Sequence, residues 1–124
     1  MRLVIALLFA VIATSARSEV SESRLLDCSA ELHNYAGFLG FLRDSGSDIN
    51  SATIDKANEE AKAIERYLVD VRRVSAEKIV TTLDKLIDVK VESSKRLMEN
   101  RGLQGTLDLY TQRAKECSNI FAGL

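Results

Sequence analysis

A stretch of 55 residues, from Ser47 to Arg101, contains neither glycine nor proline, and the chain of 124 residues has no proline at all. Glycine and proline are the residues that most often interrupt regular structure, so little in this stretch would stop a helix. It is also rich in Ala, Glu, Lys, Leu and Arg, which are strong helix formers. The sequence therefore predicts an all-α protein, and its length suits one domain.

Apolar residues recur at alternating spacings of three and four in four segments, over residues 21–43, 51–73, 76–99 and 103–122. Residues at this spacing share one face of a helix, so each segment carries an apolar stripe that must be buried. The four stripes are Leu25, Cys28, Leu32, Tyr35, Leu39 and Leu42; Ile54, Ala57, Ala61, Ile64, Leu68 and Val71; Val80, Leu83, Ile87, Val91, Ser94 and Met98; and Leu103, Leu107, Tyr110, Ala114, Cys117 and Phe121. This pattern favours an up-down four-helix bundle.

Two of the three connections that this bundle needs are clear in the sequence, and the third is weak. "DSGSDIN" at residues 44–50 has loop composition, with Asn50 or Ser51 as the next N-cap, and "NRG" places Gly102 just after a last helical turn. Between the second and third segments, "RRVSAEK" has no glycine, and only Ser75 suggests a new N-cap. The alternative is one long central helix over residues 51–99, flanked by two shorter helices, which would bury its stripes poorly as a monomer and favour a homodimer.

The first 18 residues, "MRLVIALLFAVIATSARS", have the pattern of a secretory signal peptide. A basic Arg2 precedes twelve apolar or near-apolar residues, which is shorter than the about 20 that span a bilayer. Small residues then mark a cleavage site after Ser18, with cleavage after Ala16 as the alternative. We therefore expect a periplasmic or secreted protein whose domain covers residues 19–124, with no stable membrane insertion after cleavage.

Charge argues against nucleic-acid binding. The chain has 17 basic and 18 acidic residues, and removing Arg2 and Arg17 leaves 15 against 18, a formal charge of −3. Charges of both signs alternate along the chain, whereas a nucleic-acid-binding surface needs a basic stripe.

The two cysteines, Cys28 and Cys117, favour a disulfide, because an even number of cysteines in an exported chain meets an oxidising compartment. In an up-down bundle the first helix begins beside the end of the fourth, so this pair is geometrically reasonable. The only histidine, His33, follows Cys28 by five residues, which turns it about 140° away on a helix. A thiol–imidazole pair is therefore not expected, and we interpret His33 as a surface residue.

No catalytic, metal or cofactor site is predicted. The sequence contains no phosphate-binding glycine loop, nucleophile elbow, zinc-ligand set or Glu-x-x-His motif. Asp84, Asp88 and Glu92 lie four apart on one helix face, a spacing that fits a solvated face paired with lysines such as Lys85 better than a cation site.

One segment has more apolar surface than a single stripe requires. "YAGFLGFL" at residues 35–42 is apolar on all sides. Its outer face predicts a partner surface. The structural explanation would be a central helix buried on two sides, or the loop 44–50 folded over Phe41. Glycine inside a helix costs about 1 kcal/mol relative to alanine, so Gly37 and Gly40 suggest that something packs closely there. The candidate surface comprises Ala30, Asn34, Gly37, Phe38 and Phe41.

These features together predict a small exported, non-catalytic protein that binds another protein of unknown identity in the bacterial periplasm or outside the cell. A first alternative is an inhibitor or immunity protein that blocks an enzyme with "DSGSDIN" or "NRGLQG". A second is a carrier of a small apolar ligand, with a cavity formed by the third stripe and by Ala57 and Ala61.

Overall fold

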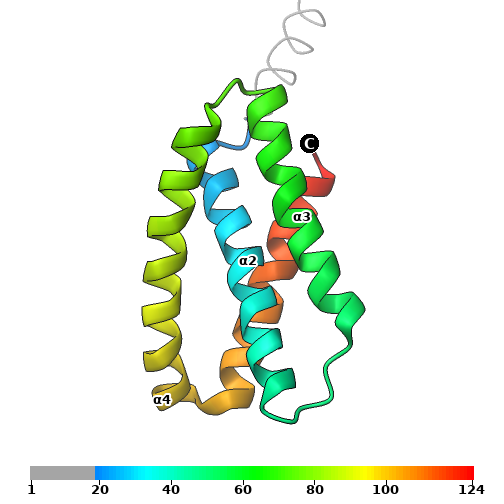
Figure 1. Cartoon of the computed structure of the whole chain (residues 1–124), viewed down its shortest axis with the longest axis vertical. Coiled ribbons are helices and arrows are strands. Elements are labelled where there is room, and N and C mark those ends of the chain that lie inside the picture. Colours follow the sequence, from blue (N-terminus) through cyan, green and yellow to red (C-terminus); the bar gives the residue numbers. More distant parts are fainter. Residues whose placement is uncertain (1–18) are drawn as a thin grey trace, which may run out of the picture.

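A computed structural model describes residues 19–124 of the chain. The predicted signal peptide, residues 1–18, lies outside the described residues. Between residues 19 and 124 the chain forms three helices and no strand: α2 at Glu22–Asp44, α3 at Ser51–Asp70 and α4 at Ala76–Ala122 (Figure 1). The all-α prediction is therefore confirmed.

Each helix begins at a side-chain cap. Ser21 accepts a hydrogen bond from the backbone N–H of Arg24 at 3.1 Å, Asn50 from Ala52 at 2.9 Å, and Ser75 from Lys78 at 3.2 Å. These oxygens satisfy N–H groups that have no partner within the helix.

The break between α3 and α4 shows that the long-helix alternative, one helix over residues 51–99, is wrong. α3 ends at Asp70, and Arg73 then takes the left-handed backbone conformation with φ 59°. The backbone N–H of Val74 donates to the carbonyl oxygen of Leu68 at 3.0 Å, which closes this turn before the cap at Ser75.

The prediction of four separate helices is also not matched, because residues 76–99 and 103–122 belong to one element, α4. Within it, only Gly102 leaves the helical region, with φ 74° and ψ 178°, a conformation that essentially requires glycine. Ser94 and Tyr110 would lie about 24 Å apart along a straight helix, yet their hydroxyls are hydrogen-bonded. α4 therefore folds back at Gly102, and we call residues 76–101 its first arm and residues 103–122 its second arm.

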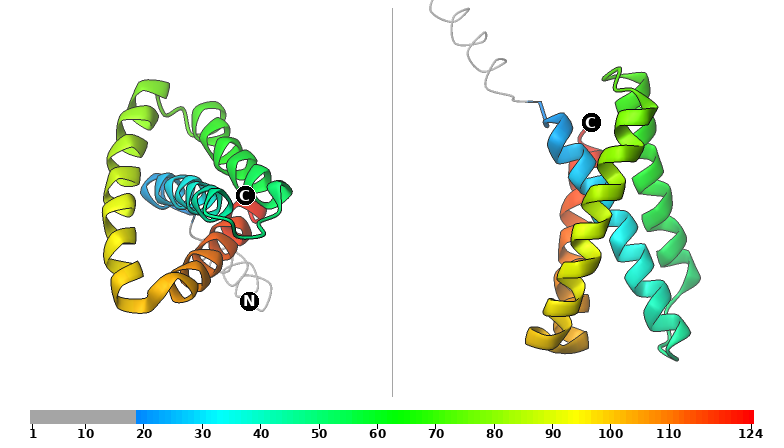
Figure 2. Two further views of the ribbon diagram at one scale, coloured as in Figure 1. Left: turned by 60° about the horizontal axis from the view of Figure 1, so that its bottom comes forward. Right: turned by 60° about the vertical axis from the view of Figure 1, so that its left-hand side comes forward.

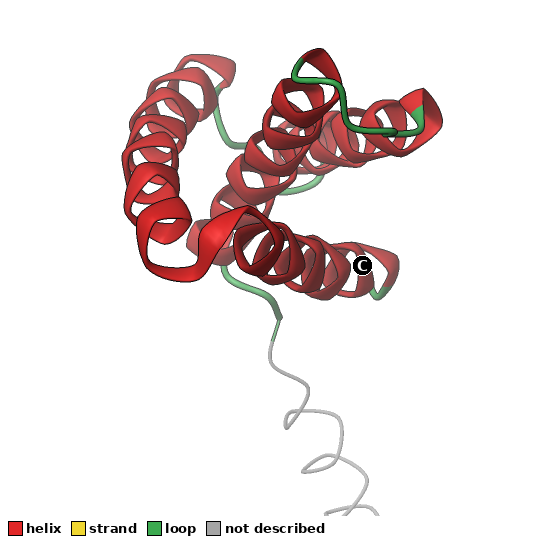
Figure 3. Ribbon diagram, turned by 90° about the horizontal axis from the view of Figure 1, so that it is seen from below, coloured by secondary structure: helices red, strands yellow, loops and turns green. Residues whose placement is uncertain are grey.

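α2 is the central helix, with α3 and the two arms of α4 around it (Figure 2). It packs extensively on both α3 and α4, whereas α3 and α4 contact each other little. Twelve of its 23 residues are buried. The predicted stripe would bury only one face of α2, so the helix is covered on more than that face. Seen from below, the α2–α3 loop and the kink of α4 lie at the same end of the molecule (Figure 3).

The predicted disulfide is confirmed. Cys28 of α2 and Cys117 of the second arm are bonded across a sequence separation of 89, with their Cα atoms 5.2 Å apart. Both are buried within the main apolar core, which α2, α3 and both arms of α4 share.

The predicted third stripe is wrong in part. The buried residues of the first arm are Ile79 and Leu83, whereas Val80 and Val91 are 58% and 47% exposed. α4 packs mainly on α2 and contacts α3 little, so part of this stripe stays uncovered.

Candidate functional site

The second half of that stripe, from Ile87 to Met98, lies in one wall of a groove between α2 and the first arm. We call it the apolar groove; its volume is about 380 Å³. Successive turns of α2 form one wall of the groove, and successive turns of the first arm form the other wall. The lining residues are His33, Asn34, Gly37, Phe38 and Phe41 from α2, and Ile87, Val91, Ser94, Lys95 and Met98 from α4.

The candidate partner surface divides between the groove and the core. Gly37 and Phe41 are exposed, Phe41 by 53%. Ala30, Asn34 and Phe38 are buried, and Phe38 packs against Tyr110 of α4. Of these three, Asn34 and Phe38 still line the groove, whereas Ala30 belongs to the core. Partner binding at this surface stays a prediction.

The two glycines of α2 are not required by packing within the described chain. A Cβ atom built on Gly37 or on Gly40 meets no heavy atom within 4 Å. Neither residue has a positive φ, so backbone conformation does not require glycine either. No part of the described chain therefore packs closely against either glycine, and Gly37 lies in the wall of the open groove.

Asn34 is a second unusual residue in the groove wall. Its side chain is largely buried, and its Nδ2 has no hydrogen-bond partner. An unpartnered buried donor costs about 1–3 kcal/mol, so this amide is destabilising in the isolated protein.

His33 joins the groove wall to α3. Its Nε2 lies 2.9 Å from Oε2 of Glu65, and the hydroxyl of buried Ser29 donates to the same oxygen at 3.1 Å. Burial alone would raise the pKa of Glu65, but the hydrogen bond and charge of His33, together with the bond from Ser29, hold it below its usual value. His33 contacts Glu65 rather than Ser29, so the three side chains do not form a nucleophile–base pair.

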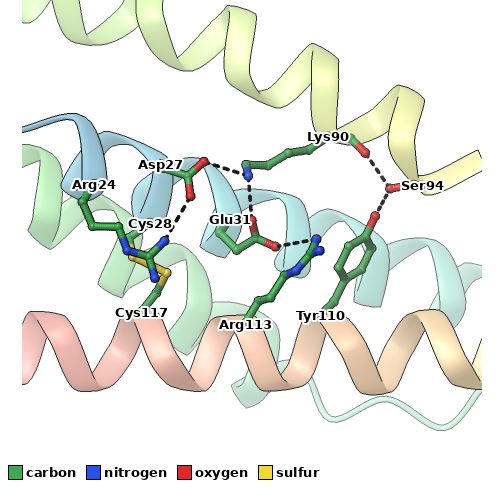
Figure 4. Close-up of polar contacts among 9 residues, drawn as sticks. All are labelled: Arg24, Asp27, Cys28, Glu31, Lys90, Ser94, Tyr110, Arg113 and Cys117. Carbon is green, nitrogen blue, oxygen red and sulfur yellow. Dashed lines mark hydrogen bonds and ion pairs between the residues drawn. A yellow bond between two sulfur atoms is a disulfide. The ribbon is translucent and has the colours of Figure 1, made fainter. Parts of the chain in front are cut away.

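A polar cluster on another side of α2 holds the first arm in place (Figure 4). Lys90 reaches from this arm to Asp27 at 3.0 Å and to Glu31 at 2.6 Å, and Arg113 of the second arm lies 3.8 Å from Glu31. The two arms themselves are joined in this view by the hydrogen bond between Ser94 and Tyr110.

The charges in this cluster compensate one another. Burial alone would lower the pKa of Lys90, but its hydrogen bonds to Glu31 and Asp27 and their negative charges raise it above the usual value. The side chain of Glu31 is 6% exposed, and its Oε1 has only the long contact to Arg113. Sequence reasoning missed both this cluster and the His33–Glu65 pair, because the partners come from different helices and no local spacing connects them.

The remaining predicted sites are dispersed. Within residues 19–124 no group of three or more His, Cys, Asp or Glu side chains is placed to hold a metal ion, and Asp84, Asp88 and Glu92 are all exposed. Ala57 and Ala61 are buried and do not line the apolar groove. Ala57 lines a separate hollow of about 380 Å³ between α2, α3 and the second arm of α4. None of the described helices combines the length and apolar character needed to cross a membrane.

The chain was compared with protein-family models, with curated proteins and with solved structures, and none of the three comparisons finds a match.

Proposed function

We propose that this protein is a non-catalytic binding protein that captures another protein through the apolar groove. The observation that carries this proposal is Gly37. Glycine in mid-helix costs about 1 kcal/mol relative to alanine, and neither backbone conformation nor packing of the described residues requires it here. A partner that approaches α2 closely over Gly37 would account for this cost.

The surroundings of Gly37 support the same function. Phe41 lies one turn away and is 53% exposed, and Val91 faces the groove from the first arm with 47% exposed. Exposed aromatic and aliphatic side chains beside a hollow are typical of protein interfaces. Met98, also in the wall, has a flexible side chain that adapts to a partner's shape.

The proposed location is the bacterial periplasm or the extracellular space. A buried disulfide is typical of proteins that fold in an oxidising compartment, and the N-terminal sequence pattern is that of an exported protein. We also propose that α2, α3 and the two arms of α4 together take the up-down order of a four-helix bundle.

A carrier of a small apolar ligand is the second candidate. The volume of the groove, about 380 Å³, falls in the range of small-molecule sites, about 300–1,000 Å³. Such sites bury about 70–90% of their ligand, and the exposure of Phe41 and Val91 favours the protein partner.

Site-specific photo-cross-linking in the native compartment tests the proposal. A photoreactive residue at Val91 lies in the groove, and one at Val89 is 64% exposed on the same arm but does not line it. We expect a protein adduct at position 91 that is absent at position 89 and that is lost in Phe41→Asp. Equal adducts at both positions, or an adduct that persists in folded Phe41→Asp, would contradict the proposal.

Native mass spectrometry of the purified protein separates the second candidate from the first. A co-purified small apolar molecule, with no protein adduct at position 91, would favour the carrier.

A further inference from the structure

The length of the apolar groove suits a helical ligand. On α2 the lining runs from His33 to Phe41, and on α4 it runs from Ile87 to Met98. At 1.5 Å per residue these walls are about 12 and 16 Å long. Side chains at positions i, i+4 and i+7 of a partner helix span about 10 Å, so the groove accommodates three successive anchors.

The backbone of the walls also favours a helix. Both walls are α-helices, whose backbone hydrogen bonds are made internally, and the described residues contain no strand edge. An extended partner segment would therefore leave its N–H and C=O groups without partners in the apolar groove, which is costly. A helix satisfies its own backbone groups and needs only side-chain contacts.

The polar groups of the groove favour an acidic residue on that helix. None of the described residues in its lining is acidic, and two of them, Asn34 and Lys95, offer N–H donors, whereas Nε2 of His33 is bonded to Glu65. Asn34 is 7% exposed with Nδ2 unpartnered, so rotation of its amide would give an incoming oxygen atom a donor.

Lys95 is available to the same oxygen. Its contact with Glu92, at 3.3 Å, is between side chains that are each 66% exposed. Exposed pairs of this kind contribute about 0–1 kcal/mol, so exchanging Glu92 for a partner's carboxylate costs little.

We infer that the occupant of the apolar groove is an amphipathic α-helix of a partner protein, with an acidic side chain that binds the amide of Asn34 and the ammonium group of Lys95. This inference rests on the proposed function and adds the chemistry of the partner to it. Apolar anchors of the helix contact Phe41, Val91 and Met98, and its backbone crosses over Gly37.

Selection from a random peptide library tests the inference without knowledge of the native partner. The probe is a phage-displayed peptide library, selected on the oxidised protein and depleted on Gly37→Leu, which fills the hollow. The enriched sequences are expected to carry apolar residues at i, i+4 and i+7 with Asp or Glu beside them. Enrichment of extended, proline-rich or basic sequences, equal enrichment on Gly37→Leu, or no enrichment would overturn the inference.

A double-mutant cycle on one enriched peptide then examines the acidic contact. Replacing its acidic residue by the amide should weaken binding to the wild type about tenfold, which corresponds to about 1.4 kcal/mol. The same replacement should have little effect on Asn34→Leu or on Lys95→Gln, a substitution at an exposed position that should leave the fold intact. An equal loss in wild type and variants would contradict the assignment of Asn34 and Lys95.

Failure of this inference and failure of the proposed function give different results. A protein that cross-links at Val91 but docks as an extended or basic segment contradicts the inference alone. Absence of any protein adduct at that position contradicts both. A concentration-dependent dimer in analytical ultracentrifugation that Phe41→Asp dissolves would identify a second copy as the occupant and overturn the inference.

Discussion

Single residues in the groove wall lower the stability of the protein. Gly37 has a low helix propensity although there is room for a side chain at this position. The side chain of Asn34 has a buried amide donor without a hydrogen-bond partner. Both costs fall on residues that line the same hollow. Residues that destabilise a fold without a structural reason are expected at functional sites, and this coincidence is why the groove carries the functional argument.

The Ser29–Glu65–His33 group predicts how acid affects stability. The pKa of Glu65 is lowered in the folded protein, so its contribution to the free energy of unfolding is present above its ordinary pKa of about 4.3. That contribution is lost as the pH falls through the folded-state pKa. Glu65→Gln should reduce stability at neutral pH by about 1–2 kcal/mol and reduce the loss of stability in acid. Urea unfolding at neutral and acidic pH measures both effects.

The control for Glu65 is Glu59→Gln, at an exposed position of the same helix. It should leave the pH dependence of the unfolding free energy close to that of the wild type. If Glu65→Gln and Glu59→Gln have the same pH dependence, the lowered pKa of Glu65 is not a source of acid sensitivity.

At the scale of the helices, the chain reversal within α4 depends on Gly102. Its φ of 74° and ψ of 178° lie in a region where a side chain costs about 1–3 kcal/mol. Gly102→Ala should therefore lower the free energy of unfolding by roughly that amount. Gly40→Ala, in the helical interior with open space around it, should raise that free energy by up to about 1 kcal/mol. Chemical denaturation of both variants is the measurement, and effects of the same sign would contradict this account of the reversal.

The first arm of α4 is held to α2 at mid-length by Lys90. From residue 84 to residue 105 the arm and the kink contain no fully buried residue, so the contacts of Lys90 with Asp27 and Glu31 matter more than a surface ion pair would. Lys90→Met should destabilise the protein by roughly 3 kcal/mol, because it leaves Glu31 buried with one long contact to Arg113. Hydrogen exchange should increase in residues 84–101 more than in α3.

Lys85→Met, at an exposed position of the same arm, is the control for Lys90 and should leave hydrogen exchange unchanged. Since the pKa of Lys90 is raised, its contribution is present below its ordinary pKa of about 10.4 and is lost as the pH rises through the folded-state value. Uniform acceleration of exchange in α3 and in the first arm of Lys90→Met would contradict a local role.

The beginnings of the helices could be predicted from the sequence because they depend on neighbouring residues. Asn50 and Ser75 cap α3 and α4 through N–H groups two and three residues away. The burial of Phe38 could not be predicted in this way, since it lies outside the regular stripe of α2. It is buried because Tyr110, far along the chain, meets it edge-on with ring centroids 5.2 Å apart.

For the whole molecule, the disulfide is expected to supply a large share of stability. It links residues 89 positions apart, and a loop of that length contributes roughly 4–5 kcal/mol in the chain-entropy model. The double variant Cys28→Ala/Cys117→Ala should lose a comparable amount in urea denaturation. Unchanged stability of the double variant, or free thiols in wild-type protein recovered from the export compartment, would contradict this prediction.

The overall arrangement was only partly accessible from the sequence. The pairing of Cys28 with Cys117 followed from export and from the up-down order of the segments. The central place of α2 was one of the explanations that the apolar segment 35–42 left open, and the sequence could not decide it, because burial on several sides depends on how the helices cross. The groove could be predicted in part: Gly37 and Phe41 mark one wall in the sequence. The other wall, Ile87 to Met98, contains the second half of the third stripe, which the sequence predicts either as buried core or as the lining of a ligand cavity shared with Ala57 and Ala61.

The paired substitutions Gly37→Leu and Gly40→Leu test most directly whether the groove is the binding surface. Both replace a helical glycine with open space around it, so both should raise the free energy of unfolding, by about 0.5–1 kcal/mol. Only Gly37 lines the groove. We predict that Gly37→Leu abolishes the protein adduct at position 91 while Gly40→Leu retains it. A retained adduct in folded Gly37→Leu, or equal loss in both variants, would contradict the account.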